Sequence, residues 1–209
     1  MLILQKLWLT YQVRKFSKQF YRFFELQRTN PLGIEVDGLK HQTPNPFFDL
    51  YYVLKKYTLE VLNKNRRFGQ QKGIDLQISY LSPTDIDFVQ SYLMSTVATQ
   101  TKYLEKNLFI LSTIVSLAPF LGLLGTVWGI LLTFSELQTN AVGNGQGMVL
   151  SGISLALATT VLGLIDAIPA LIGYNYLKNS VRDFQTDMEG FSNELLASVE
   201  IYYRKVDVS

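Results

Sequence analysis

Cysteine is absent from the 209-residue chain, and histidine occurs once. The chain therefore forms no disulfide and has no thiol for metal binding or redox chemistry. The single histidine, His41, lies in the Pro-rich stretch "KHQTPNPFF", where we interpret it as a solvated loop residue and not as a ligand. The 19 basic residues barely outnumber the 17 acidic ones, which gives no indication of a nucleic-acid partner. Clustered His, Cys or carboxylate residues are missing, so we expect no metal, no cofactor and no enzyme.

Charge is also missing from two long stretches. Residues 107–135 contain no Asp, Glu, Lys, Arg or His, and residues 148–177 contain Asp166 as their one charged residue. Each stretch exceeds the roughly 20 residues that cross a bilayer as a helix. The sequence therefore predicts two transmembrane helices, over 107–135 and 148–177.

Lys and Arg are unevenly distributed around these stretches. Fifteen of the 19 precede the first, four follow the second, and the connector 136–147 has none. By the positive-inside rule, residues 1–106 and 178–209 are cytoplasmic, and the connector, rich in Gly and Asn, lies on the far side of the membrane. The two spans thus form a hairpin, and the bulk of the chain is cytoplasmic.

The segment before the first span has a helical pattern interrupted by Pro and Gly. Residues 2–27 are basic and aromatic, as in an interfacial helix or the end of a membrane helix that continues into the cytoplasm. A second helix is predicted over 47–67. Ser82, followed by Pro83 and two acidic residues, is typical of a helix start. We expect that helix to reach Lys106 and to lead directly into the first span.

Residues 178–209 are predicted to continue the second span as an amphipathic cytoplasmic helix, packed on the helix over 47–67 or on that ending at Lys106. We find no strand-like alternation. The predicted fold class is an all-α membrane protein whose long transmembrane helices extend into a cytoplasmic helical bundle. The apolar stripe of the last helix consists of Phe184, Met188, Phe191, Leu195 and Val199.

Small residues recur at helical spacing in both spans, and such residues let helix backbones approach closely in a membrane. We predict that they serve helix packing within a hairpin and between subunits as well. In the first span they are Gly122, Gly125 and Gly129; in the second the ridge contains Gly152, Ala156, Thr160, Gly163, Ala167 and Ala170.

Two prolines and several threonines interrupt the apolar character of the spans. Pro119 and Pro169 each free a carbonyl one turn earlier, and we expect them to distort the helices locally. Thr126, Thr159 and Thr160 place hydroxyls deep in apolar sequence. For each hydroxyl two readings stay open, a bond to its own helix or a place along a pore.

The two spans resemble a known family. "APFLGLLGTVWGI", residues 118–130, and "SGISLALATTVLGLIDAIPALIGYNYL", residues 151–177, resemble the last two membrane helices of the MotA/TolQ/ExbB proton-channel family, particularly its TolQ and ExbB members. The resemblance implies a ring, pentameric in TolQ and ExbB, around a single-span partner of the TolR or ExbD type. It also implies location in the bacterial inner membrane, with a periplasmic connector, and the use of proton flow to drive motion passed to the envelope.

The resemblance also implies roles for particular residues. Thr126 matches the polar residue of the family's G-T-V-W motif, and Thr160 matches the threonine of its A-T-A-I-G-L segment, so both would line the channel. The family's glutamate in G-I-A-E-A-L is absent, because the matching residue is Leu155. The family has three spans, so residues 2–27 would be the end of the first, and either the start is truncated or this member has an unusual N-terminus.

Asp166 is the residue that the family pattern does not explain. It lies eleven residues after Leu155, and therefore on nearly the same side of a helix, together with Thr159. One hypothesis is that Asp166 carries the proton in place of the missing glutamate. The alternatives are a structural pair with a lysine or a neighbouring subunit, and an incidental polar site.

Two functions follow from these patterns. The first is a proton-driven motor subunit that works with lipid, copies of itself and a single-span partner, in TolQ-like envelope maintenance or ExbB-like uptake. The second is a non-conducting membrane scaffold that has lost the glutamate. A small single-span partner with a membrane aspartate would favour the first.

Overall fold

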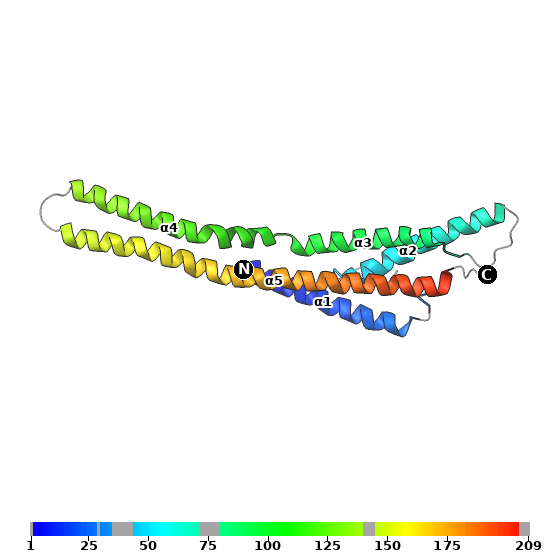
Figure 1. The fold of residues 1–209 in the computed structure, drawn as a ribbon. Helices are drawn as coiled ribbons and strands as arrows, with labels where there is room; N and C mark the ends of the chain where they lie inside the picture. The colour runs from blue at the N-terminus through cyan, green and yellow to red at the C-terminus, as the bar shows by residue number, and fades with distance from the viewer. Residues whose placement is uncertain (1, 29, 35–43, 72–79, 140–144, 205–209) are drawn as a thin grey trace. The chain divides into compact units, whose positions relative to one another are not determined.

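The computed structural model of the chain describes residues 2–28, 30–34, 44–71, 80–139 and 145–204, so His41 and the centre of the connector lie outside the described residues. All regular elements in these ranges are helices (Figure 1), which confirms the all-α prediction. The five helices are α1 (Leu2–Leu26), α2 (Pro46–Gln71), α3 (Pro83–Glu105), α4 (Leu108–Thr139) and α5 (Gly145–Tyr203).

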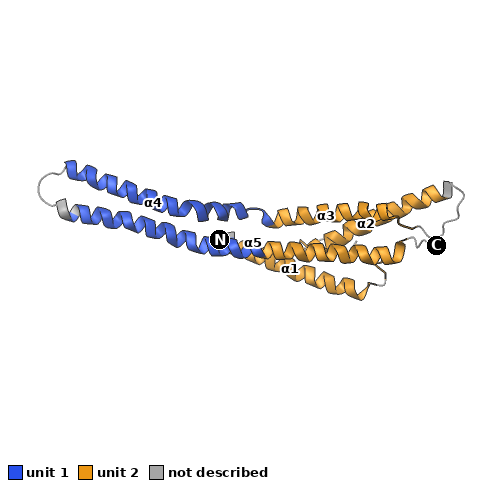
Figure 2. Cartoon of the chain, viewed as in Figure 1, with its two compact units in different colours: residues 1–3, 105–179 blue, residues 4–104, 180–209 orange. Residues whose placement is uncertain are grey.

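The chain divides into two compact units, coloured separately in Figure 2. Unit 1 contains Met1–Ile3 and Glu105–Asn179, and unit 2 contains Leu4–Leu104 and Ser180–Ser209. Helix α5 is continuous and contributes to both.

Unit 1 is built around the hairpin of α4 and α5. The contacts between the two helices pair rising residue numbers in α4 with falling numbers in α5, from Ala118 beside Gly163 to Gly129 beside Ala156, so the helices are antiparallel (Figure 1). By length and composition, α4 and α5 are the two described helices able to cross a membrane. Most of their large apolar side chains are exposed in the single chain, as expected of helices that lipid or other subunits cover.

The junction before α4 is a turn at Lys106 and Asn107, so α3 does not run straight into the first span as the sequence analysis expected. Asn107 has a φ of 70°, a left-handed conformation that asparagine tolerates better than most residues and that commonly ends a helix. Its carbonyl then accepts a hydrogen bond from the Ile110 N–H at 3.2 Å and starts α4.

Unit 2 has an aromatic core. The predicted apolar stripe of α5 is buried along its whole length, from Phe184 at 2% exposed to Val199 at 2%. Phe191 stacks on Phe47 of α2, with ring centroids 4.5 Å apart, and contacts Phe24 of α1 edge-on at 5.4 Å. The prediction that the stripe packs on α2 is therefore confirmed, and α1 shares that core.

Helix α3 begins as predicted. The Ser82 hydroxyl accepts a hydrogen bond from the Asp85 N–H at 3.2 Å, and the Asp85 carboxylate accepts one from the Ser82 N–H at 2.9 Å. This reciprocal pair is a capping box. Burial alone would raise the pKa of Asp85, but hydrogen bonds from Ser82 and Asn65 outweigh burial and hold that pKa below its usual value.

Candidate functional site

The candidate site is the seam between α4 and α5, where glycines of α4 lie against small residues of α5. A Cβ placed on Gly129 would lie 2.8 Å from the Cβ of Ala156, and one on Gly125 would lie 2.6 Å from the Thr159 hydroxyl oxygen. Both distances are too short for non-bonded carbon and oxygen atoms, so the two backbones approach as closely as they do because side chains are missing.

Glycines of α5 complete the seam from the other side. A Cβ on Gly163 would lie 2.7 Å from the Ala118 carbonyl oxygen, and one on Gly152 would lie 3.0 Å from the Cβ of Thr133. Between these two contacts, a Cβ on Gly122 of α4 would lie 3.0 Å from the Cα of Thr160 of α5. The small residues that the sequence analysis singled out thus meet each other inside one chain.

A cluster of hydroxyls surrounds the Gly122 carbonyl at the centre of this seam. The carbonyl oxygen lies 3.2 Å from the Thr126 hydroxyl, 3.1 Å from that of Thr160 and 3.3 Å from that of Thr159. The hydroxyls of Thr126 and Thr160 also contact each other directly. We call Gly122, Thr126, Thr159 and Thr160 the threonine cluster.

The threonine cluster has more donors than its central acceptor can serve. A carbonyl oxygen has two lone pairs, and the backbone N–H one turn later already uses one in a regular helix. Thr159 lies closer to another acceptor, the Ala156 carbonyl oxygen at 2.6 Å. Of Thr126 and Thr160, one can therefore donate to Gly122 while the other donates to its neighbour. The cluster thus has alternative hydrogen-bond arrangements.

Asp166 does not join the threonine cluster. It lies seven residues beyond Thr159, about 10 Å along the helix axis, and its side chain is exposed, whereas the neighbouring Ala167 is buried at 6% exposed. Leu155, at the position of the family's glutamate, is also on the uncovered side and is 70% exposed. The structure therefore brings together three of the four predicted pathway residues and places the fourth on the open face of α5.

No ion pair in the described part of the chain includes Asp166. Lys178 lies twelve residues later in the same continuous helix, about 18 Å along its axis and beyond salt-bridge reach. The Lys178 ammonium instead lies 5.6 Å from the ring centroid of Tyr174. A structural pair between Asp166 and Lys178 of the same chain is thereby excluded.

Pro119 and Pro169 lie inside α4 and α5, and both helices continue through them. Pro119 follows Ala118, whose carbonyl faces Gly163, so the proline-containing turn belongs to the seam. Pro169 is exposed and lies on the same helix turn as Asp166. The two prolines therefore occupy different surroundings, one in the seam and one on the open face.

Sequence reasoning missed Thr133. Its side chain is 6% exposed, its hydroxyl donates to the Gly129 carbonyl at 2.8 Å, and it packs against Gly152. The signal was present in the sequence: Thr126 follows Gly122 by four residues and Thr133 follows Gly129 by four, so the same Gly-to-Thr pattern repeats after seven residues. Each threonine bonds back to the glycine carbonyl one turn earlier.

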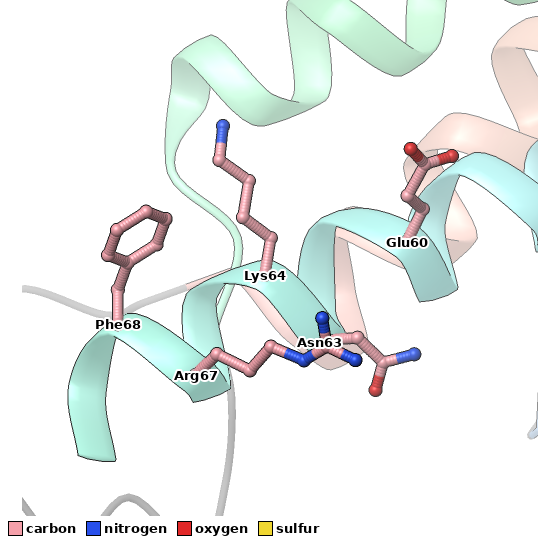
Figure 3. A pocket seen from close by; sticks show the side chains of 5 residues that line it. All are labelled: Glu60, Asn63, Lys64, Arg67 and Phe68. Atoms are coloured by element: carbon pink, nitrogen blue, oxygen red, sulfur yellow. The ribbon is translucent and has the colours of Figure 1, made fainter. Parts of the chain in front are cut away.

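Unit 2 contains a shallow hollow on α2, lined by Glu60, Asn63, Lys64, Arg67 and Phe68. All five side chains come from successive turns of one helix, and Figure 3 shows Lys64 and Phe68 pointing away from Asn63 and Arg67. The side chains do not converge on a common point, so the hollow is a surface feature. Among the described residues, no group of His, Cys, Asp and Glu could hold a metal ion.

The fold and the seam define the class: a helical membrane hairpin with a polar cluster in its centre, joined to a helical bundle. Residues 64–190, more than half of the chain, match the MotA/TolQ/ExbB proton channel family. The chain belongs to this family, which confirms the resemblance noted for its two spans.

Individual relatives support the same assignment. The chain is 46% identical over 99 residues to the biopolymer transport protein ExbB of Aquifex aeolicus, covering 47% of this chain and 66% of that protein. It is 37% identical over 150 residues to the biopolymer transport protein ExbB of Pseudomonas putida, covering 72% of this chain and 42% of that protein. It is 41% identical over 91 residues to the Tol-Pal system protein TolQ of Haemophilus influenzae, covering 44% and 40%. The matched region is less than two thirds of the length of each relative.

Proposed function

We propose that the chain is a ring-forming subunit of a motor in the bacterial inner membrane that is driven by the proton-motive force. It conducts protons together with a single-span partner of the TolR or ExbD type and transmits force to the cell envelope. The threonine cluster supports this proposal most directly, because it gathers exchangeable hydroxyl protons between two apolar helices, inside the stretch that matches a proton channel family.

Ring formation is supported by the outer faces of the hairpin. Trp128 of α4 is 60% exposed, and Leu155 and Leu162 of α5 are 70% and 62% exposed. Because the small residues are already used between α4 and α5, we place neighbouring subunits and lipid against these larger apolar faces. A pentamer, as implied for TolQ and ExbB, would enclose a central space for the partner helix.

Asp166 is the proposed proton carrier. An ionised carboxylate on the apolar face of a span is costly unless a partner, water or a proton neutralises it. In a ring this face of α5 would meet the central partner, so Asp166 would bind and release a proton as that partner moves. Moving one charge through 100 mV supplies about 2.3 kcal/mol.

Thr159 would connect the carboxylate to the threonine cluster. Its side chain is half-buried at the edge of the seam, and its hydroxyl lies within reach of both the Ala156 and Gly122 carbonyls. The separation of about 10 Å between Thr159 and Asp166 is too long for a direct bond, so water in the assembled pore would bridge it.

In the proposed orientation, residues 1–106 and 178–209 are cytoplasmic and the connector 136–147 is periplasmic. The charge distribution supports this orientation, because Lys and Arg flank the two spans and are absent from the connector. The similar proteins include one named for biopolymer transport and one named for the Tol-Pal system. Envelope maintenance and nutrient uptake are therefore both compatible with the proposal.

A second candidate is a non-conducting scaffold of the same family. The observation that favours it is Leu155, an exposed apolar side chain where the family has its glutamate. Such a scaffold would form the ring and bind the partner without passing protons.

Purification of the full chain in mild detergent, together with any small single-span protein that accompanies it, tests the proposal. Native mass measurement is expected to show several copies of the chain with the partner, and vesicles containing the complex should take up protons under an imposed potential. A monomer without a partner would contradict the ring. A ring that passes no protons would support the scaffold instead.

A further inference from the structure

Helix α1 has a straight exposed stripe along its outer side. Its members follow one another at intervals of three or four residues, so they lie within about 40° of a common line, and the stripe extends about 27 Å along the helix. Leu4, Trp8 and Tyr11 are 73%, 61% and 66% exposed. The α1 stripe consists of Leu4, Trp8, Tyr11, Lys15, Lys18 and Arg22, all exposed.

The opposite side of α1 is fixed in the core of unit 2. Val13 is 1% exposed and Phe24 is fully buried. The Arg14 guanidinium donates to the Ser180 carbonyl at 2.6 Å, and the Phe24 ring contacts Phe191 at 5.4 Å. These contacts define the side of α1 that faces the core, so the α1 stripe lies on the outer surface of unit 2.

The chemistry of the α1 stripe changes in order along the helix. Its first two turns present an aliphatic and two aromatic side chains, and its next two turns present three cations. Tryptophan and tyrosine are enriched where hydrocarbon meets headgroups, and lysine and arginine near a bilayer surface are attracted to anionic lipids. This is the order in which a helix leaving the hydrocarbon would meet the layers of a membrane.

The start of α1 lies beside the end of the apolar run of α5. Within unit 1, Ile3 is packed against Gly173, since a Cβ on Gly173 would lie 2.9 Å from the Cδ1 of Ile3. Four residues after Gly173, the apolar run of α5 ends at Leu177 and Lys178 follows. Leu4, the first residue of the α1 stripe, directly follows Ile3 in the same helix.

We propose that the α1 stripe binds the bilayer surface. Trp8 and Tyr11 lie at the boundary between hydrocarbon and headgroups, and Lys15, Lys18 and Arg22 bind anionic lipid phosphates. The charge of this half of the stripe favours an anionic bilayer over a second copy of the chain, because two copies would bring six cations together. The inference rests on the proposed function only in requiring that unit 1 is inserted in a membrane.

The two tryptophans of the chain provide a test with an internal reference. Trp8 and Trp128 have nearly equal exposure, 61% and 60%, and each becomes the sole tryptophan in Trp128→Phe and Trp8→Phe respectively. The full-length variants are placed in vesicles of phosphatidylglycerol and brominated phosphatidylcholine, and quenching is measured. We expect quenching of Trp8 by bromine near the headgroups and of Trp128 by bromine deep in the chains.

The outcomes separate this inference from the proposed function. Quenching of Trp128 without quenching of Trp8 would overturn the proposal for the α1 stripe and indicate that protein or water covers it. Quenching of neither would overturn the proposal for the α1 stripe, and failure of the chain to float with the vesicles would overturn the membrane function as well.

The cationic half is tested by removing charge. We compare K15Q/K18Q/R22Q with K64Q/R66Q/R67Q, in which three exposed cations of α2 are removed instead. The ratio of phosphatidylglycerol to phosphatidylcholine retained by the purified protein should fall at least about fivefold in the α1 variant, the effect of one lost cation near a membrane, and should stay unchanged in the control. An equal fall in both variants, or in neither, would overturn the assignment of the anionic lipid to the α1 stripe.

Discussion

The two units of this chain are both made of helices, yet their interiors differ. In unit 2, Phe24, Phe47 and Phe191 fill the space between helices with large rings. In unit 1, Gly129 and Ala156 leave almost no space between helices, and the polar groups of the seam are hydroxyls. Most large apolar side chains of the unit 1 spans are exposed in the single chain, whereas unit 2 buries a core of large side chains.

The difference follows from the surroundings of each unit. In water, burying apolar area stabilises a bundle, so large inward rings are favourable. In lipid, the outside is as apolar as the inside, and helices associate through close backbone contact and hydrogen bonds between them. The chain therefore needs aromatic residues between the helices of unit 2 and glycines between the helices of unit 1. Substitutions at these residues should have different effects in the two units.

The largest expected effect is loss of an aromatic ring from unit 2. Phe191→Ala should destabilise the protein by about 3–5 kcal/mol, because the ring is 3% exposed and its removal leaves a cavity. Thermal unfolding of the full chain in mild detergent, followed by circular dichroism, measures the loss. Ile201→Ala, at a position 79% exposed, is the control and should change stability by less than about 0.5 kcal/mol. Equal effects would contradict the assignment of the core.

Enlarging a glycine should have the next largest effect, and its sign should depend on the unit. In Gly129→Leu, the first added carbon, Cβ, would lie 2.8 Å from the Cβ of Ala156. The substitution should therefore lower the free energy of unfolding by about 1–3 kcal/mol. Gly190→Leu is the matched control in unit 2, where a Cβ meets nothing within 4 Å, and should stabilise α5 slightly through helix propensity. The same thermal measurement distinguishes them. Destabilisation by both variants would contradict the claim that close backbone contact in the seam is what requires glycine at position 129.

The capping box of α3 should give a pH-dependent contribution of about 1 kcal/mol. Since the folded pKa of Asp85 lies below its ordinary value of 3.8, the stabilisation is complete above that value and is lost as the pH falls through the folded pKa. Asp85→Ala should therefore be less stable than the parent at neutral pH and equal to it in strong acid. A difference that persists in strong acid would mean that packing, and not the charge, is responsible.

The smallest expected change in stability comes from the threonine cluster. Thr160→Val keeps the shape of the side chain but removes its hydroxyl, at a cost of about 0.6 kcal/mol, the average for a hydrogen bond between membrane helices. Thr113→Val is the control, because its exposed hydroxyl bonds only one turn back, to the Phe109 carbonyl. Proton uptake by vesicles should fall in the first variant and remain in the second. Unchanged proton uptake in both variants would show that the Thr160 hydroxyl is not part of the proton pathway.

Local signals predicted much of this structure. The charge-free stretches indicated α4 and the first half of α5, the Ser82–Pro83 pair indicated the start of α3, and the spacing from Phe184 to Val199 indicated the buried side of α5. Each of these features depends on residues near one another in the sequence.

Features that depend on distant contacts were harder to predict. The buried side of α1 includes Thr10 and Ser17 beside Phe20 and Phe24, so no purely apolar stripe marks it. The Gly-to-Thr spacing marks Thr133 in the sequence, but its contact with Gly152 of the facing helix could not be read from that spacing. The small-residue ridge of α5 indicated the side that α4 covers, and the spacing from Leu155 to Asp166 indicated that these two residues share a side. That their side lies outside the seam depends on contacts with α4, which the sequence does not show.

The central claim is that Asp166 has taken the role of the glutamate absent at Leu155, and a swap of the two positions tests it most directly. Proton uptake is measured in vesicles containing the chain and its single-span partner, for the parent, for Asp166→Asn, and for Asp166→Asn combined with Leu155→Glu, with native mass confirming assembly. The account predicts uptake by the parent, loss in Asp166→Asn and recovery in the combined variant. Uptake by an assembled Asp166→Asn complex equal to that of the parent would contradict it.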